Sequence, residues 1–291
     1  MLSLFRRSPN RGQSKRRPPR KFRIENLESR YCLSAVTLGL SAQTATGHNV
    51  EVSVNVMGSE QSYQVSLAGP VQATIAVDSS GWAMYEGPAT SLGTITGTVT
   101  DSDGDTAQAS CEITDSPSQI NSLTVVATGQ GKQVEVSGSV TSQSPSGLQV
   151  TLSGSAGVGG SVTTDANGDF DFVTTAASLG DVSAVVKDVW GVDSAPMTTT
   201  LTVPPPQIVG FTAVSMGNGY FELQGTINGP DVADDSLAFS GMSSASGSPD
   251  STGSFSIVVY LGSDSPAGTE YAVATDVWGQ SSPQASYTFS T

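Results

Sequence analysis

Hydrophobic and polar residues alternate along most of the chain. Clear runs are 133–140, 148–152, 181–185 and 269–273. Alternation over about four to eight residues is typical of a strand with one buried face. No stretch repeats its hydrophobic residues with the 3.6-residue period of a helix. The pattern therefore predicts an all-β protein built from short strands.

Three short markers recur with a common spacing. The turn pattern D-x-x-G begins at Asp78, Asp165 and Asp250. A later pattern, D-V-W-G, begins at Asp188 and Asp276, and the sequence D-S-D-G at Asp101 takes its place in the first unit. A strand-like marker opens each unit, and its copies are Val50-Glu51-Val52, Val134-Glu135-Val136 and Phe221-Glu222-Leu223. Such self-similarity predicts a repeat architecture.

The markers divide the chain into a leader and three units. The leader is 1–35, and the units are 36–115, 120–203 and 207–291. About seven short strands fit each unit, which predicts three tandem immunoglobulin-like β-sandwiches without the cysteine pair and tryptophan of antibody domains. Asn167-Gly168, between two alternating runs, predicts a type I′ hairpin turn.

The composition excludes several other classes. Charged residues make up 13% of the 291 residues, about half the usual share. The 32 glycines have no period of three, so the chain is not collagen-like. No apolar run of about 18 residues is present, so we expect no transmembrane helix.

Charge is distributed unevenly. The formal net charge is −14, yet residues 1–30 hold ten of the twelve Lys and Arg and only two acids. An acidic body repels nucleic acid and attracts cations, so we expect no nucleic-acid partner. The basic, proline-containing leader is expected to be disordered and dispensable for folding.

The end of the leader carries a recognisable segment. Leu27, Glu28 and Arg30, followed by Leu33-Ser34-Ala35, resemble the N-terminal LEPR-XLL segment of planctomycete extracellular proteins. Ser29 stands in the place of the proline, and Cys32 in that of the first leucine. The resemblance implies export, and hence an extracellular or cell-surface protein.

The last hairpin of each unit carries a second resemblance. Residues 184–194 are similar to the final hairpin of bacterial Ig-like modules, and 99–107 to the repeat of Ig-like and RTX-type adhesin domains. This implies a structural or stalk protein that presents loops for weak multivalent contacts with extracellular protein or polysaccharide. The alternatives are an adhesin or carbohydrate-binding module with a specific ligand, and an accessory part of a secreted enzyme system.

Residues suited to catalysis are scarce. The one histidine, His48, lies in the turn before the second predicted strand, and nothing at the matching positions of the other units repeats it. Histidine catalysis needs a nucleophile and an orienting carboxylate nearby. We therefore expect an exposed loop histidine and no enzyme activity.

Acidic turns suggest calcium, because hard cations prefer several oxygen ligands. The candidate sets are Asp101, Asp103 and Asp105; Asp165, Asn167 and Asp169, with Asp171; and Asp231, Asp234 and Asp235. The alternative is that these residues form solvated turns, where Asp and Gly are favoured for backbone reasons. In the second set, alternation places Asp169 and Asp171 on one face and Phe170 and Phe172 on the other.

Two tryptophans and two cysteines complete the candidates. Trp190 and Trp278 occupy matching hairpin tips, where they either bind a sugar or protein partner or pack against a neighbouring sandwich or their own core. Cys32 lies just before the first predicted strand and Cys111 lies in the last strand of the first unit. Either they form a disulfide, or Cys32 belongs to the leader and Cys111 is a small buried hydrophobe.

Overall fold

A computed structural model describes residues 36–58, 60 and 62–290. Over these residues the chain is almost entirely β, and its one helical element is the 3-10 turn η1 (Val232–Asp234). The all-β prediction is confirmed. No helix within the described ranges is long and apolar enough to cross a membrane. The predictions for the leader, and the half of the disulfide prediction that concerns Cys32, fall outside the described residues.

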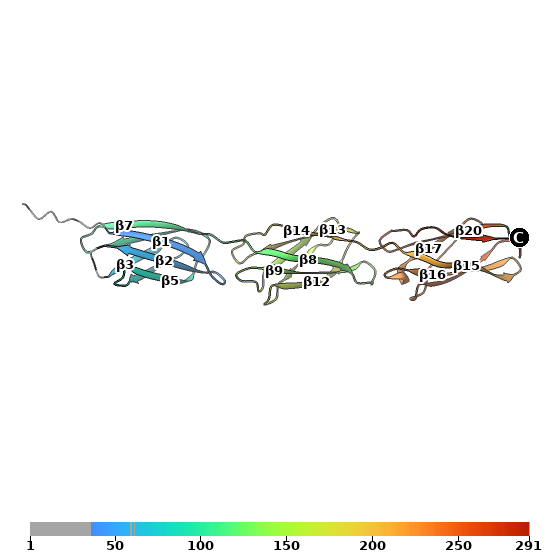
Figure 1. Cartoon of the computed structure of the whole chain (residues 1–291), viewed down its shortest axis with the longest axis horizontal. Coiled ribbons are helices and arrows are strands. Elements are labelled where there is room, and N and C mark those ends of the chain that lie inside the picture. Colours follow the sequence, from blue (N-terminus) through green and yellow to red (C-terminus); the bar gives the residue numbers. More distant parts are fainter. Residues whose placement is uncertain (1–35, 59, 61, 291) are drawn as a thin grey trace, which may run out of the picture. The chain divides into compact units, whose positions relative to one another are not determined.

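Each repeat contains seven strands (Figure 1). The first sandwich consists of β1 (Thr37–Thr44), β2 (Asn49–Met57), β3 (Tyr63–Ala68), β4 (Ala73–Val77), β5 (Trp82–Pro88), β6 (Gly93–Thr100) and β7 (Thr106–Ile113). The second consists of β8 (Gln119–Ala127), β9 (Gln133–Thr141), β10 (Gln149–Ser153), β11 (Gly160–Thr163), β12 (Asp169–Thr175), β13 (Gly180–Lys187) and β14 (Met197–Leu201). The third consists of β15 (Gln207–Gly217), β16 (Tyr220–Asn228), β17 (Ser236–Ser240), β18 (Ala245–Gly247), β19 (Ser254–Tyr260), β20 (Gly268–Thr275) and β21 (Ala285–Phe289).

All three sandwiches share one topology. A three-stranded sheet has the order β1-β2-β5, repeated as β8-β9-β12 and β15-β16-β19. A four-stranded sheet has the order β4-β3-β6-β7, repeated as β11-β10-β13-β14 and β18-β17-β20-β21. All pairs are antiparallel. The fourth strand pairs with the third, whereas in antibody constant domains it joins the sheet of the first two strands. The folds are therefore Ig-like without being antibody-like.

The V-E-V marker lies in the middle of each three-stranded sheet. Val134 and Val136 are fully buried on β9, while Glu135 between them faces outward. Since successive strand residues point to opposite faces, the two valines enter the core and the glutamate meets solvent. Each sandwich has its own separate core of such residues.

One cross-strand pair in this sheet changes size between sandwiches. Val54 on β2 lies opposite Ala83 on β5. The second sandwich has Gly138 opposite Phe170 at this place, and the third has Gly225 opposite Phe255. The phenylalanine ring covers the glycine in both: a Cβ on Gly138 would lie 2.5 Å from the Phe170 ring, and one on Gly225 2.7 Å from the Phe255 ring. The volume lost at the glycine is therefore filled from the opposite strand.

Candidate functional site: acidic turns and sandwich joints

All six D-x-x-G segments fold into one kind of turn. In the turn at Asp165, an Oδ1 atom accepts hydrogen bonds from the backbone N–H groups of Asn167 (2.8 Å) and Asp169 (2.9 Å). Gly168 has a φ of +90°, which favours glycine, and its N–H donates to the Asp165 carbonyl. The other five turns repeat this scheme at Asp78, Asp101, Asp188, Asp250 and Asp276. The motif thus encodes hairpin geometry.

The predicted type I′ turn at Asn167-Gly168 is wrong. That turn needs positive φ at both residues, and Asn167 has none. The Asp165 carboxylate instead holds a turn in which only the glycine is left-handed. A hairpin with both central residues left-handed joins β15 to β16, where Asn218 has φ +56° and Gly219 has φ +78°.

The backbone donors also set the electrostatics of these turns. Hydrogen bonds from Asp169 and then Asn167 lower the pKa of the Asp165 carboxyl. The Ser80 hydroxyl, followed by backbone N–H groups, lowers the pKa of Asp78, and the Thr252 hydroxyl does so for Asp250. These three carboxylates are held in their charged form by their own turns.

The three acidic sets do not converge into metal sites. Within the part of the chain that the structure describes, no three His, Cys, Asp or Glu side chains gather in a way that could hold a metal ion. Asp101 directs Oδ1 at the N–H groups of Asp103 and Asp105, so one of its oxygens serves the turn. The segment that follows, Thr106–Ile113, is a strand. Calcium binding itself stays a prediction of the sequence.

The second acidic set lines an open polar groove on the second sandwich. The groove has a volume of about 740 Å³ and includes Asp165, Asp169 and Asp171 together with Ser and Thr side chains of β8 and β9. The predicted alternation is confirmed, because Asp169 and Asp171 are exposed while Phe170 is buried. Asn167 is exposed on the turn and is not among the groove residues.

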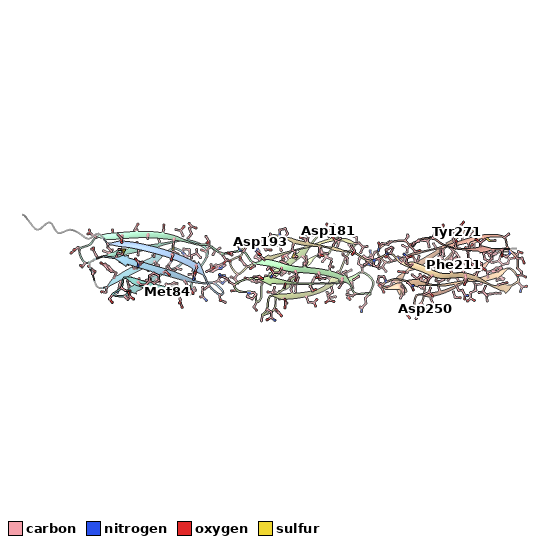
Figure 2. The ribbon with its side chains drawn as sticks, in the orientation of Figure 1. Met84, Asp181, Asp193, Phe211, Asp250 and Tyr271 are labelled. Atoms are coloured by element: carbon pink, nitrogen blue, oxygen red, sulfur yellow. The ribbon has the colours of Figure 1, made fainter. Side chains whose placement is uncertain are left out.

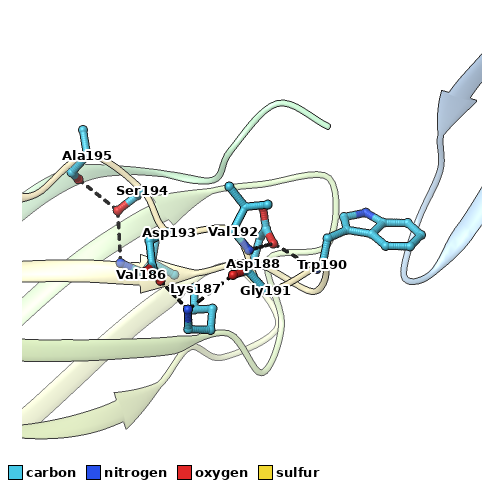
Figure 3. A network of polar contacts seen from close by, with 9 residues as sticks. All are labelled: Val186, Lys187, Asp188, Trp190, Gly191, Val192, Asp193, Ser194 and Ala195. Atoms are coloured by element: carbon cyan, nitrogen blue, oxygen red, sulfur yellow. Dashed lines mark hydrogen bonds and ion pairs between the residues drawn. The ribbon is translucent and has the colours of Figure 1, made fainter. Parts of the chain in front are cut away.

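Trp190 lies at a joint between sandwiches. Its indole projects from the β13–β14 turn toward a ribbon of the first sandwich (Figure 3) and packs against the first core. The ring of His48 meets it edge to face, with ring centroids 4.9 Å apart. Beside this contact, the Gly47 N–H donates to the Ser144 hydroxyl at 2.6 Å. His48 is exposed, as expected, and it also takes part in the joint.

The turn beneath Trp190 is tied down by polar contacts (Figure 3). Asp188 accepts hydrogen bonds from the N–H groups of Trp190 (2.9 Å) and Val192 (2.8 Å). Lys187 forms an ion pair of 2.6 Å with Asp193, although both side chains are largely exposed. Because an exposed pair contributes little, the Asp188 contacts are what position the indole.

Trp278 repeats this arrangement one sandwich later. It projects from the β20–β21 turn and packs against the second core. The Lys132 ammonium lies 5.9 Å from the centroid of its ring, a cation–π distance. The Gly131 N–H donates to the Asp231 carboxylate, and the Gln280 side-chain amide donates to the Val203 carbonyl at 2.8 Å. His48 and Lys132 each lie two residues before the V-E-V marker of their own sandwich. The two tryptophans therefore contact equivalent positions of the sandwiches that precede them.

Both tryptophans therefore adopt the packing alternative of the sequence analysis, and partner binding by them stays a prediction. The first sandwich has Asp103 at the matching turn position, so the D-x-W-G pattern marks the turns that dock on a preceding sandwich. The replacement of tryptophan by Asp103 in the first unit is the sequence feature that distinguishes its turn from the two turns that dock on a preceding sandwich.

An exposed apolar face on the third sandwich was not predicted. The exposed fractions are 61% for Tyr260, 47% for Tyr220 and 58% for Met216. The two tyrosines are cross-strand neighbours with ring centroids 5.0 Å apart. Exposed apolar side chains on the first sandwich include Met84 (Figure 2). The sequence feature that could have revealed this face is the presence of tyrosines at outward-facing positions of β16 and β19.

The third acidic set contains one buried member. Asp231 and Asp234 are at least partly exposed, whereas Asp235 is 2% exposed.

Cys111 is half-buried on β7 and packs against the first core. Burial, and after it the charge of Glu112, raises the pKa of its thiol. A thiol in such surroundings is held in its neutral, unreactive form.

Scans of protein-family models and of curated proteins found no match to this chain. Among solved structures, a Ca2+-stabilized adhesin with which an Antarctic bacterium binds ice is 21% identical, with a TM-score of 0.25 over 88% of this chain and 73% of that one. A biofilm-associated protein BSP domain is 11% identical, with a TM-score of 0.26 over 91% and 68%. Fibronectin(III)-like modules of Clostridium thermocellum CbhA are 17% identical, with a TM-score of 0.23 over 58% and 90%. At these values the similarities assign no function.

Proposed function

We propose that this protein is a secreted or cell-surface structural array, in which Ig-like sandwiches hold exposed loops and sheet faces in place for adhesive contacts. The repeated joint is the observation that carries the proposal. Two successive joints place a tryptophan from an equivalent turn on the preceding core, opposite His48 or Lys132. Catalysis or small-molecule binding gives no reason to repeat such a joint.

The joint supports this role through its physical design. An aromatic ring removes a large apolar area from water when it docks on a neighbouring core. Each joint adds a hydrogen bond between sandwiches, from Gly47 to Ser144 and from Gly131 to Asp231. Loops on successive sandwiches thereby keep a constant spacing and orientation, which lets several weak contacts form at once where the spacing matches the partner. The resemblance of residues 27–35 to an export segment supports placement outside the cytoplasm.

Cell fractionation with mass analysis of the intact protein tests the location. We expect the protein outside the cytoplasm, on the surface of intact cells or in the medium, with residues of the leader removed. Recovery of the full-length chain from the cytoplasm alone would refute the proposed function.

Removing a docking ring is expected to loosen one joint and leave the other intact. In Trp190→Ala, exchange of the Gly47 amide hydrogen should accelerate about tenfold, and in Trp278→Ala that of the Gly131 amide, because each ring contributes about 1.4 kcal/mol to closing its joint. Hydrogen exchange followed by NMR measures both amides in the same sample.

Each variant serves as the other's control, since its second joint is unaltered. Trp82→Ala removes a tryptophan that is 44% exposed and takes no part in either joint, so it should change neither rate. Unchanged exchange at Gly47 in Trp190→Ala would show that the indole does not hold the joint.

A further inference from the structure

Asp235 is a buried carboxylate without a partner. It directly follows η1, precedes β17 and is 2% exposed. Among the residues that the structure describes, neither of its carboxylate oxygens has a hydrogen-bond partner. A charge buried without hydrogen bonds is strongly unfavourable, so such a group calls for a specific explanation.

The sibling sandwiches have apolar residues at this position. Residue 148 precedes β10 as residue 235 precedes β17, and it is Leu148, 3% exposed. Counted from the pairing of β3 with β6, the matching residue of the first sandwich is Tyr63, 6% exposed. The fold therefore has no need of a carboxylate here.

Three other carboxylates lie close enough to Asp235 to influence its charge. Asp231 precedes η1 as its N-cap, Asp234 is the last residue of η1, and Asp276 comes from the β20–β21 turn. Burial raises the pKa of Asp235 to about 6, with further contributions from the charges of Asp276, Asp231 and Asp234. Lys132, a cation at the joint, donates its hydrogen bond to the Ala177 carbonyl and lies over Trp278.

This cluster belongs to the end of the third sandwich that contacts the second. Asp231 accepts the hydrogen bond from Gly131, and Asp276 supports the turn that carries Trp278. We infer that Asp235 makes this end of the sandwich sensitive to pH, so that loss of its charge in mildly acidic solution stabilises the third sandwich.

The sign follows from proton linkage. The folded state holds the Asp235 proton at a higher pH than the unfolded chain, whose ordinary pKa is 3.8. Between these values folding takes up a proton, so stability increases as pH falls through about 6 toward about 4. Above this window the carboxylate is charged in both states, and the full cost of its burial remains.

Unfolding of the full chain at two pH values tests the inference. From about pH 7.5 to about pH 5, the unfolding equilibrium constant of the third sandwich should fall about tenfold in the unaltered protein. Hydrogen exchange of β17 and β20 measures it, with rates corrected for intrinsic pH dependence. Asp235→Leu, which copies Leu148, should be more stable at the higher pH and lose this response. The 13C spectrum of labelled aspartates should contain one carboxyl with a midpoint near 6 that is absent in Asp235→Asn.

Asp171→Asn is the matched control, because it removes an exposed carboxylate of the second sandwich and should keep the response. If Asp235→Leu does not fold, the nearly isosteric Asp235→Asn decides. Persistence of the pH response in the Asp235 variants would overturn the inference. So would a gain with calcium at the higher pH that equals the gain with acid, since the cluster would then be a cation site.

Discussion

Replacing Gly138 with alanine should destabilise the second sandwich by about 3 kcal/mol, a large overpacking effect. The new Cβ would lie 2.3 Å from the Ser122 carbonyl oxygen and 2.5 Å from the Phe170 ring. Ser122 belongs to the bulge of β8, where pairing with β9 shifts register, so its carbonyl cannot move away without disturbing the sheet. Urea unfolding of the full chain, followed by hydrogen exchange of β9 and β12, measures the loss.

Gly225→Ala is the matched comparison in the third sandwich. There the new Cβ meets the Phe255 ring at 2.7 Å, but the nearest backbone oxygen, that of Val209, is 3.2 Å away. Because a ring end moves more easily than a backbone, this variant should lose only about 1–2 kcal/mol. Equal losses in both variants would show that the ring, rather than the Ser122 carbonyl, sets the limit.

Glu270→Ala should destabilise the third sandwich by about 3–4 kcal/mol. Glu270 is fully buried on β20, and its carboxylate accepts hydrogen bonds from the Ser243 N–H (2.8 Å) and hydroxyl (2.6 Å). The truncation leaves a cavity and removes the acceptors of both donors in the β17–β18 connection. Hydrogen exchange of β17 and β20, combined with the unfolding midpoint in urea, measures the loss.

Glu270→Gln is the control, because an amide keeps the shape and pairs with both Ser243 groups; it should cost about 1 kcal/mol or less. If Glu270→Gln lowers the free energy of unfolding as much as Glu270→Ala does, the charge of Glu270 and not its hydrogen bonds stabilises this site. The third sandwich thus holds two buried carboxylates, Glu270 and Asp235, that are expected to affect its stability in opposite directions. Glu270 has partners and is expected to stabilise, whereas Asp235 has none and is expected to destabilise at neutral pH.

The alternation of hydrophobic and polar residues was enough to predict the strands. It also predicted which residues of β9 and β12 face the core and which face solvent. The V-E-V and D-x-x-G markers likewise located the repeats, since both depend on local geometry. A strand exposes alternate residues, and a glycine after an Asp-headed turn adopts the left-handed conformation. The error at Asn167 arose because the Asp165 side chain supplies a local alternative that the Asn-Gly pair alone does not reveal.

The sequence by itself thus determined the all-β class, the three units and the places of their turns, because period, spacing and turn chemistry act over a few residues. Only the tertiary structure decided which surfaces meet. It placed Trp190 on the first core, paired Gly138 with Phe170, and buried Asp235 among carboxylates where its siblings are apolar. These outcomes depend on contacts between residues far apart in the chain, whose burial and partners no local pattern specifies.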